Sequence, residues 1–169
     1  MTIRCLVDIC RTSKRSASIV FVDYRKAFDS VRRASIAPIL RMYGVSECLV
    51  RAITSLYKDT SARIQTAHGP TDSFRTSSGV LQGDTLSPFL FIMMIDYVLR
   101  CSLSESLGFE VSPRRSSRQP AKYVTALAYA DDIALVARDS TCAAIVMSRL
   151  QEVSARHGLA VDLKKSSCT

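Results

Sequence analysis

Apolar and polar positions alternate along the chain in short segments that predict a mixture of strands and helices. The β-branched and aromatic run at residues 18–24 predicts a buried strand that ends on Asp23. Two further apolar runs, residues 124–128 and 133–137, flank a pair of aspartates and predict a hairpin. Apolar residues recur at helical spacing elsewhere, and the expected helices cover residues 3–10, 35–43, 46–57, 89–103 and 140–157. This alternation favours an α/β fold in which helices back a small sheet.

Turn and capping residues mark the connections between these elements. Residues 63–66 and 73–76 flank a Gly-Pro turn and predict a second hairpin. Ser87 is expected to cap the helix at 89–103, and because that helix is apolar nearly all round it should be central and buried. The remaining candidate strands are residues 108–111 and 159–163.

Length and composition indicate one globular domain that covers residues 1–169. Hydrophobic residues make up 47% of the chain and charged residues 22%, a composition too apolar for a disordered protein. No apolar run approaches the roughly 18 residues of a membrane span, and the charged start of the chain lacks the apolar core of a signal peptide. The 6 cysteines show no zinc-ligand spacing and indicate free thiols in a reducing compartment. We therefore expect an intracellular location, nuclear or cytoplasmic, without secretion and with no membrane partner.

The net charge of +8 and the isoelectric point near 9.4 favour a polyanionic partner, above all nucleic acid. A dense basic patch at residues 114–122 contributes to this charge. Pro113 and Pro120 predict a loop there, and the simplest interpretation of the patch is a solvated loop.

Asp131 and Asp132 stand side by side at the predicted turn of the acidic hairpin. Two adjacent carboxylates repel each other, and their desolvation is unfavourable unless a cation or hydrogen-bond donors compensate. An Asp-Asp turn without further role is the plainest alternative. Asp23 is the candidate partner, because the three carboxylates converge if the two strands are neighbours in one sheet. Clustered carboxylates suit Mg²⁺ or Mn²⁺, and two such ions about 4 Å apart support phosphoryl or nucleotidyl transfer.

Four segments in order resemble the conserved motifs of reverse transcriptases. Residues 21–31 (FVDYRKAFDSV) resemble motif A, 79–88 (GVLQGDTLSP) motif B, 129–132 (YADD) motif C and 158–166 (GLAVDLKKS) motif D. Together they span roughly residues 18–166. The Lys-Ala-Phe-Asp and Leu-Ser-Pro sequences, and the Ala of the third motif, resemble the non-LTR (LINE-type) branch and group II introns more than retroviruses.

The resemblance implies a polymerase palm, a small antiparallel sheet backed by helices, with partial fingers and no thumb. Asp23 and Asp131 would then ligate two Mg²⁺ or Mn²⁺ ions, and Asp132 would support the site. The missing fingers and thumb segments are expected in a longer polyprotein.

The same resemblance assigns nucleotide contacts to Tyr24, Phe28, Gln82, Gly83 and Lys165. The backbone from Tyr24 would lie along the triphosphate, and Phe28 would lie under the sugar and exclude a 2′-hydroxyl. A core phenylalanine is the alternative for Phe28, and a plain turn before a capped helix is the alternative for Gln82 and Gly83. Lys165 would approach the pyrophosphate, although the preceding lysine is equally well placed.

The implied function is RNA-directed DNA polymerisation, with an RNA template, a DNA primer and dNTP as partners. One alternative is a catalytically inactive remnant that at most binds nucleic acid. A second alternative, an RNA-dependent RNA polymerase palm, is disfavoured by the aromatic residue at Phe28 and by the Gln-Gly pair of the second motif.

Overall fold

The computed structural model describes residues 2–81 and 83–162 and the backbone of residues 167–168. The chain forms two compact units, which are described separately below. The sheet unit consists of Met1–Arg25 and Ile95–Thr169, and the arm unit consists of Lys26–Met94. The long helix α5 (Ser87–Ser102) contributes residues to both.

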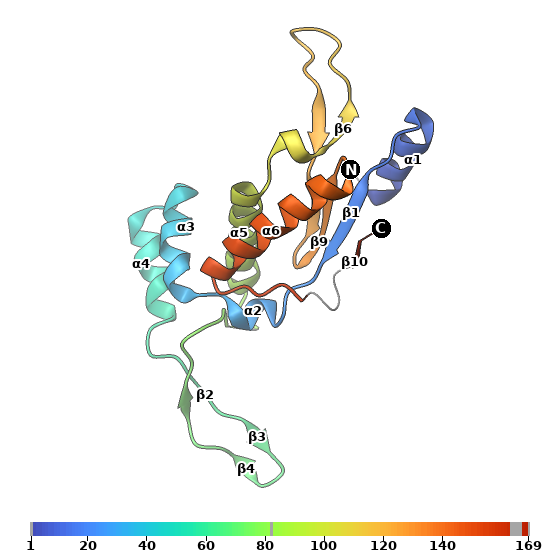
Figure 1. The fold of residues 1–169 in the computed structure, drawn as a ribbon. Helices are drawn as coiled ribbons and strands as arrows, with labels where there is room; N and C mark the ends of the chain where they lie inside the picture. The colour runs from blue at the N-terminus through green and yellow to red at the C-terminus, as the bar shows by residue number, and fades with distance from the viewer. Residues whose placement is uncertain (1, 82, 163–166, 169) are drawn as a thin grey trace. The chain divides into compact units, whose positions relative to one another are not determined.

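A four-stranded antiparallel sheet organises the sheet unit (Figure 1). Its strand order is β10 (Ser167–Cys168), β1 (Ser18–Val22), β9 (Asp132–Ala137) and β8 (Ala126–Tyr129). The strand predicted before Asp23 and the hairpin predicted around the aspartate pair therefore form, and they are direct neighbours in the sheet. Residues 133–137 of β9 are all buried, as expected for an inner strand covered on both faces.

The two faces of this sheet are covered to different extents. Val20 and Leu135 are paired and share the face against which α6 (Ser140–Arg156) packs. Ile19 and Val136 share the opposite face, where Leu6 of α1 (Ile3–Ser13) packs on them. Phe21 lies further along that second face and is 40% exposed. The second face is thus covered at one end and open at the other, next to the aspartates.

Of the two further strands predicted in the sheet unit, one forms and the other is reduced to a bridge in its described part. β6 (Phe109–Ser112) is present and pairs with β7 (Lys122–Val124), which belongs to a hairpin separate from the main sheet. The chain changes sheets at Thr125, whose carbonyl oxygen accepts a hydrogen bond from Val136. Of the predicted strand at 159–163, the described part forms an isolated antiparallel bridge between Val161 and Tyr24.

The arm unit is built on two packed helices, α3 (Ile36–Met42) and α4 (Glu47–Leu56). It also contains the short helix α2 (Ala27–Ser30) and the 3₁₀ turn η1 (Arg33–Ser35). The apolar positions predicted from helical spacing are buried between the helices, namely Ile36, Ile39, Leu40, Val50 and Ile53. The helix predicted at residues 35–43 thus forms as α3, which directly follows η1 and ends before Gly44, as predicted.

A long hairpin, residues 61–75, extends away from these helices and is called the arm (Figure 1). At its base β2 (Ser61–Ala62) pairs with β5 (Phe74–Arg75), and at its tip β3 (Gln65–Thr66) pairs with β4 (Gly69–Pro70). The hairpin therefore forms at the predicted position, but its strands pair in two short separate ladders and not in one continuous ladder.

Helix α5 corrects two expectations. Ser87 lies within its first turn and is buried, and its hydroxyl donates to the carbonyl oxygen of Leu81, so Ser87 is not the N-cap. Asp84 accepts the Leu86 amide one turn earlier, as a capping side chain does. The helix is also not buried all round, since Phe89 is 65% and Ile92 50% exposed. In the described part of the chain, no helix is long and apolar enough to span a bilayer.

Candidate active site

The acidic hairpin closes with a two-residue loop, Ala130-Asp131, between the paired residues Tyr129 and Asp132. Ala130 has φ +54, a left-handed conformation that is unfavourable for a residue with a Cβ atom. Glycine usually takes the first position of such tight hairpin loops. The neighbouring strands therefore hold a strained turn in place and present Asp131, which is exposed, at its end.

Asp23 stands opposite this hairpin. Val22 pairs with Ile133 across β1 and β9, so continuing the antiparallel register by one residue places Asp23 across from Asp132. Both aspartates line one hollow of about 590 Å³ on the open end of the sheet, together with Phe21 and Tyr129. Like charges opposite each other on neighbouring strands are destabilising, and a bound cation would remove that repulsion.

The donor set of this hollow is suited to a hard divalent cation. Mg²⁺ keeps several of its waters and is usually bound through one or two carboxylates, so the pair formed by Asp23 and Asp132 fits it. Within residues 2–81 and 83–162, no group of three or more His, Cys, Asp and Glu side chains could hold a metal ion. Asp131 is not part of the hollow's lining. The arrangement therefore differs from the three-carboxylate cluster of the sequence interpretation, because Asp131 lies in the turn, outside the strand ladder.

Tyr24 is directed away from the hollow. It is 5% exposed, and its hydroxyl lies 2.9 Å from the hydroxyl oxygen of Ser154 on α6. Burial raises the pKa of Tyr24 above its usual value, and the hydrogen bond with Ser154 opposes that rise. The alternation of side chains along the strand therefore puts Asp23 and Tyr24 on opposite faces of the sheet.

The backbone after Asp23 is held by the chain that follows α6. The Arg25 amide donates to the carbonyl oxygen of Ala160 at 2.8 Å, and the Asp162 amide donates to the carbonyl oxygen of Asp23 at 2.8 Å. Arg25 also forms an ion pair with Asp162 at 3.5 Å. This pairing occupies the amide of Arg25, one of the groups predicted to lie along a triphosphate.

Phe28 and Gly83 line the same hollow in the arm unit. This hollow of about 350 Å³ is also lined by Asp84 and Pro88. The ring of Phe28 also stacks on Phe91 of α5, with centroids 4.3 Å apart and planes 23° apart. Phe28 is partly exposed while Phe91 is fully buried. Phe28 is thus a core contact on one side and faces a hollow on the other, so its two predicted roles are compatible.

Gly79 joins the second motif to the first, a contact that the sequence interpretation did not include. Its amide donates to the carbonyl oxygen of Val31 at 2.8 Å, and the Val80 amide donates to that of Phe28 at 2.9 Å. Gly79 has φ +81, and a Cβ atom there would lie 2.8 Å from backbone atoms of Asp29. The glycine that opens motif B is the only available signal for this close approach.

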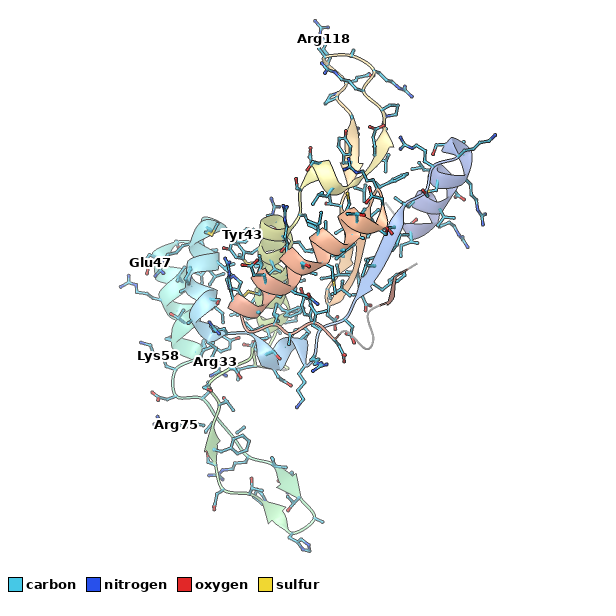
Figure 2. The ribbon with its side chains drawn as sticks, viewed as in Figure 1. Arg33, Tyr43, Glu47, Lys58, Arg75 and Arg118 are labelled. Atoms are coloured by element: carbon cyan, nitrogen blue, oxygen red, sulfur yellow. The ribbon has the colours of Figure 1, made fainter. Side chains whose placement is uncertain are left out.

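Arg33 is a second residue that sequence reasoning missed. Its guanidinium donates to the carbonyl oxygens of Gly79 at 2.9 Å and Thr76 at 2.7 Å, and to the hydroxyl of Thr60 at 2.6 Å. It also lies over the ring of Tyr57, 5.4 Å from the centroid. Figure 2 shows Arg33 between the helices of the arm unit and the base of the arm. Nothing in the sequence around Arg33 signals this role, because its partners are far away along the chain.

Two predicted nucleotide contacts, Gln82 and Lys165, lie outside the described residues. Their placement in the site stays a prediction.

Known proteins resemble this chain both in sequence and in fold. The family model "Reverse transcriptase (RNA-dependent DNA polymerase)" matches residues 1–169. A Pol polyprotein from the type-1 retrotransposable element R2 of Popillia japonica is 30% identical over 157 residues, which are 92% of this chain and 21% of that protein. The Pol polyprotein from the type-2 element R2DM of Drosophila melanogaster is 30% identical over 151 residues, 89% of this chain and 13% of that protein. The chain therefore spans a small part of these relatives.

Solved telomerase structures share the fold. Apo telomerase from Candida tropicalis matches 98% of this chain and 31% of its own with a TM-score of 0.70 and 12% identity. Telomerase from Candida albicans in complex with a TWJ fragment of telomeric RNA matches 98% of this chain and 29% of its own, with a TM-score of 0.69 and 13% identity. At these identities the likeness shows the fold alone, and it supports a polymerase palm.

The sequence match agrees with the fold, and R2 elements are non-LTR retrotransposons, as the resemblance of motifs A, B and C implies. This chain belongs to the reverse transcriptase (RNA-dependent DNA polymerase) family.

Proposed function

We propose that this chain is the palm of an RNA-directed DNA polymerase, which extends a DNA primer on an RNA template with dNTP. The observation that carries the proposal is the placement of Asp23 opposite Asp132 at the open end of the sheet, where both line one hollow. The family match over the whole chain supports the same reaction class. The net charge of +8 suits polyanionic substrates, whose phosphates release counterions on binding.

Asp23, Asp131 and Asp132 are the proposed catalytic residues. In the proposal, Asp23 and Asp132 would hold divalent cations at the hollow that they line, and Asp131 would add a carboxylate from the adjacent exposed turn. Two Mg²⁺ or Mn²⁺ ions supply, when bound, a lowered pKa at the primer 3′-hydroxyl and charge stabilisation at the leaving phosphate oxygen. The protein contributes position, because the strained turn and the β1–β9 ladder fix where the carboxylates stand.

Nucleotide recognition is assigned to Phe28 and Gly83, with Gln82, Lys165 and the backbone at Tyr24 as further proposed contacts. The hollow beside Phe28 supports this assignment, since the ring has one face packed on Phe91 and is therefore held rigidly. A rigid aromatic surface can select between sugars by shape.

We further propose that this chain works together with other segments of a longer polyprotein. The R2 relatives support this, because the chain spans 21% and 13% of their lengths. Fingers and thumb segments would supply the additional grip on the template, the primer and the triphosphate.

The test is primer extension on an RNA template with Mg²⁺ or Mn²⁺. We compare the wild-type chain with Asp23→Asn and Asp132→Asn, and with Asp72→Asn, an exposed aspartate of the arm, as a matched control. Loss of a metal-binding carboxylate should lower the rate at least about 100-fold, whereas the control should retain it. Extension by Asp23→Asn at the wild-type rate would contradict the proposed mechanism.

A second candidate function, nucleic-acid binding without catalysis, is favoured by one observation. Three carboxylates do not gather into a metal-binding group among the described residues. If this alternative is correct, the chain binds an RNA template yet incorporates no nucleotide with either metal ion, even when the concentrations of both substrates saturate.

A further inference from the structure

The β6–β7 hairpin of the sheet unit ends in a loop with a high density of positive charge. We call β6, β7 and residues 113–121 between them the basic hairpin. Arg114, Arg115, Arg118 and Lys122 are all exposed, and residues 111–130 include no aspartate or glutamate. Figure 2 shows Arg118 at the tip, directed outward.

These four cations differ from several other arginines of the sheet unit, which are neutralised by a carboxylate. Arg15, Arg100 and Arg156 each form an ion pair with a carboxylate. Over the described parts of the chain, the four cations of the basic hairpin form no ion pair. Like charges held this close repel one another, so an external polyanion would be attracted to them and would relieve the repulsion.

The tip is an ordered turn and not an extended loop. The Arg115 amide donates to the carbonyl oxygen of Gln119 at 3.1 Å, and the Gln119 amide donates to that of Ser116 at 3.2 Å. A hollow of about 380 Å³ lies at this end of the hairpin, and Arg115, Arg118, Gln119 and Lys122 are in its lining. The ordered turn therefore fixes the backbone positions from which the basic side chains extend. Less conformational entropy is then lost on ligand binding than with a flexible loop.

The chemistry of the tip fits nucleic acid better than a lipid surface. Residues 113–122 contain no large apolar side chain that could insert between lipids, as membrane-surface segments do. Arginine donates a planar pair of hydrogen bonds to phosphate, and Ser and Gln side chains also contact phosphates and sugars. Tyr123 follows Lys122 on β7 and is 39% exposed, so a base could stack on it.

We infer that the tip of the basic hairpin is a contact site for the sugar-phosphate backbone of a single-stranded nucleic acid, gripped by Arg115, Arg118 and Lys122. The identity of that strand as an RNA template rests on the proposed function. The contact itself requires only phosphates. The hollow at the tip of the basic hairpin is separate from the hollow lined by Asp23 and Asp132, because the two share no lining residue.

The experiment measures binding of a fluorescently labelled single-stranded RNA by the full chain, without metal ions or dNTP, at several KCl concentrations. The test variant is the triple substitution Arg115→Gln, Arg118→Gln, Lys122→Gln. Each phosphate contact on a single strand contributes about 0.7 to the slope of log K against log salt, so three contacts predict a slope smaller by about 2. At 100 mM KCl the affinity should fall about 10- to 100-fold.

The matched control removes three positive charges elsewhere with Arg51→Gln, Lys58→Gln and Arg149→Gln, all of them exposed. It should change the slope far less than the test variant. Single-stranded DNA of the same sequence should respond as RNA does, because the contacts are to phosphates. An unchanged melting temperature shows that the exposed substitutions leave the fold intact.

Three results would overturn the inference: equal slopes for the test and control variants, no RNA binding by the wild-type chain, or a larger effect of the test variant on binding to phosphatidylserine vesicles than to RNA. Failure of the proposed function looks different. In that case primer extension is absent, while the slope of RNA binding still depends on the basic hairpin.

Discussion

A Cβ atom on Gly79 would lie 2.8 Å from the Cα atom of Asp29. Backbone atoms of motif B and motif A thus touch in the arm unit, and the contact is closed by hydrogen bonds from the Gly79 and Val80 amides. Motif B thus begins against α2, the short helix that carries Phe28, so the position of one motif depends on the other.

The first prediction concerns this contact. Gly79→Ala should lower the free energy of unfolding by about 2–4 kcal/mol, because the new methyl group adds a backbone clash to the strain of a positive φ. Gly44→Ala is the matched control, since Gly44 has a similar φ of +76 but nothing within 4 Å of its Cβ position. Urea denaturation measures both. If both variants lose the same free energy of unfolding, the close approach to Asp29 does not contribute to the cost of the Gly79 substitution.

The second prediction concerns Arg33 as a positioning residue. Arg33→Lys keeps the charge but cannot reach Gly79, Thr60 and Thr76 at once, because a lysine lacks the planar fork of donors. We expect the free energy of unfolding to fall by about 1–3 kcal/mol. Hydrogen exchange should also become faster at the Thr76 amide, which donates to Thr60 at the base of the arm. Arg51→Lys, on the exposed side of α4, should leave that exchange rate unchanged; matching rates in the two variants would contradict the role of Arg33.

The third prediction uses the buried hydroxyl pair of Tyr24 and Ser154. Removing one partner leaves the other unsatisfied in the core, so Tyr24→Phe and Ser154→Ala should each cost about 1–3 kcal/mol. The double variant should lose less than the sum of the two single losses. Denaturation of all four proteins checks this, and additive losses would mean that the 2.9 Å contact contributes no coupling.

The fourth prediction is that the stability of the folded protein depends on pH through Tyr24. Burial raises the pKa of Tyr24 in the folded protein above the ordinary value near 10. The folded state therefore keeps its proton at a pH where the unfolded chain has lost it. The contribution to stability is complete below about pH 10 and is lost as the pH rises through the folded pKa. Between pH 9 and 12 the wild-type protein should lose stability more steeply than Tyr24→Phe, and parallel curves would refute the prediction.

The fifth prediction depends on the proposed function. Phe28→Ala should raise the use of rNTP relative to dNTP, because the ring that is held on Phe91 would no longer exclude a 2′-hydroxyl. Competition between rNTP and dNTP during primer extension measures the ratio. Phe91→Leu serves as the control for lost packing, as it removes the stacking partner but keeps the Phe28 ring. A ratio that changes equally in both variants would indicate a structural effect only.

Sequence patterns alone were sufficient for the longer helices and for the strands around the aspartates. The alternation of β-branched residues predicts β1, β8 and β9, and helical spacing predicts α3, α4, α5 and α6, because these signals depend on neighbours a few residues away. The two-residue turn between Tyr129 and Asp132 was also predictable, since its flanking strands are strongly apolar. The ordered motifs indicated the reverse transcriptase family, which the match over the whole chain confirms.

Contacts between distant segments required the tertiary structure. The register of β1 on β9 decides that Asp132, and not Asp131, stands opposite Asp23, because one residue of shift moves a side chain to the other face. Because side chains alternate along the strand, the Tyr24 side chain points to the other face, where its hydroxyl contacts Ser154 of α6. Gly79 approaches Asp29, and Arg33 holds the base of the arm, through bonds whose partners lie tens of residues apart. Local patterns thus determined which elements this chain forms and which chemistry it carries, whereas long-range packing decided which side chains meet, since only the folded backbone brings them within bonding distance.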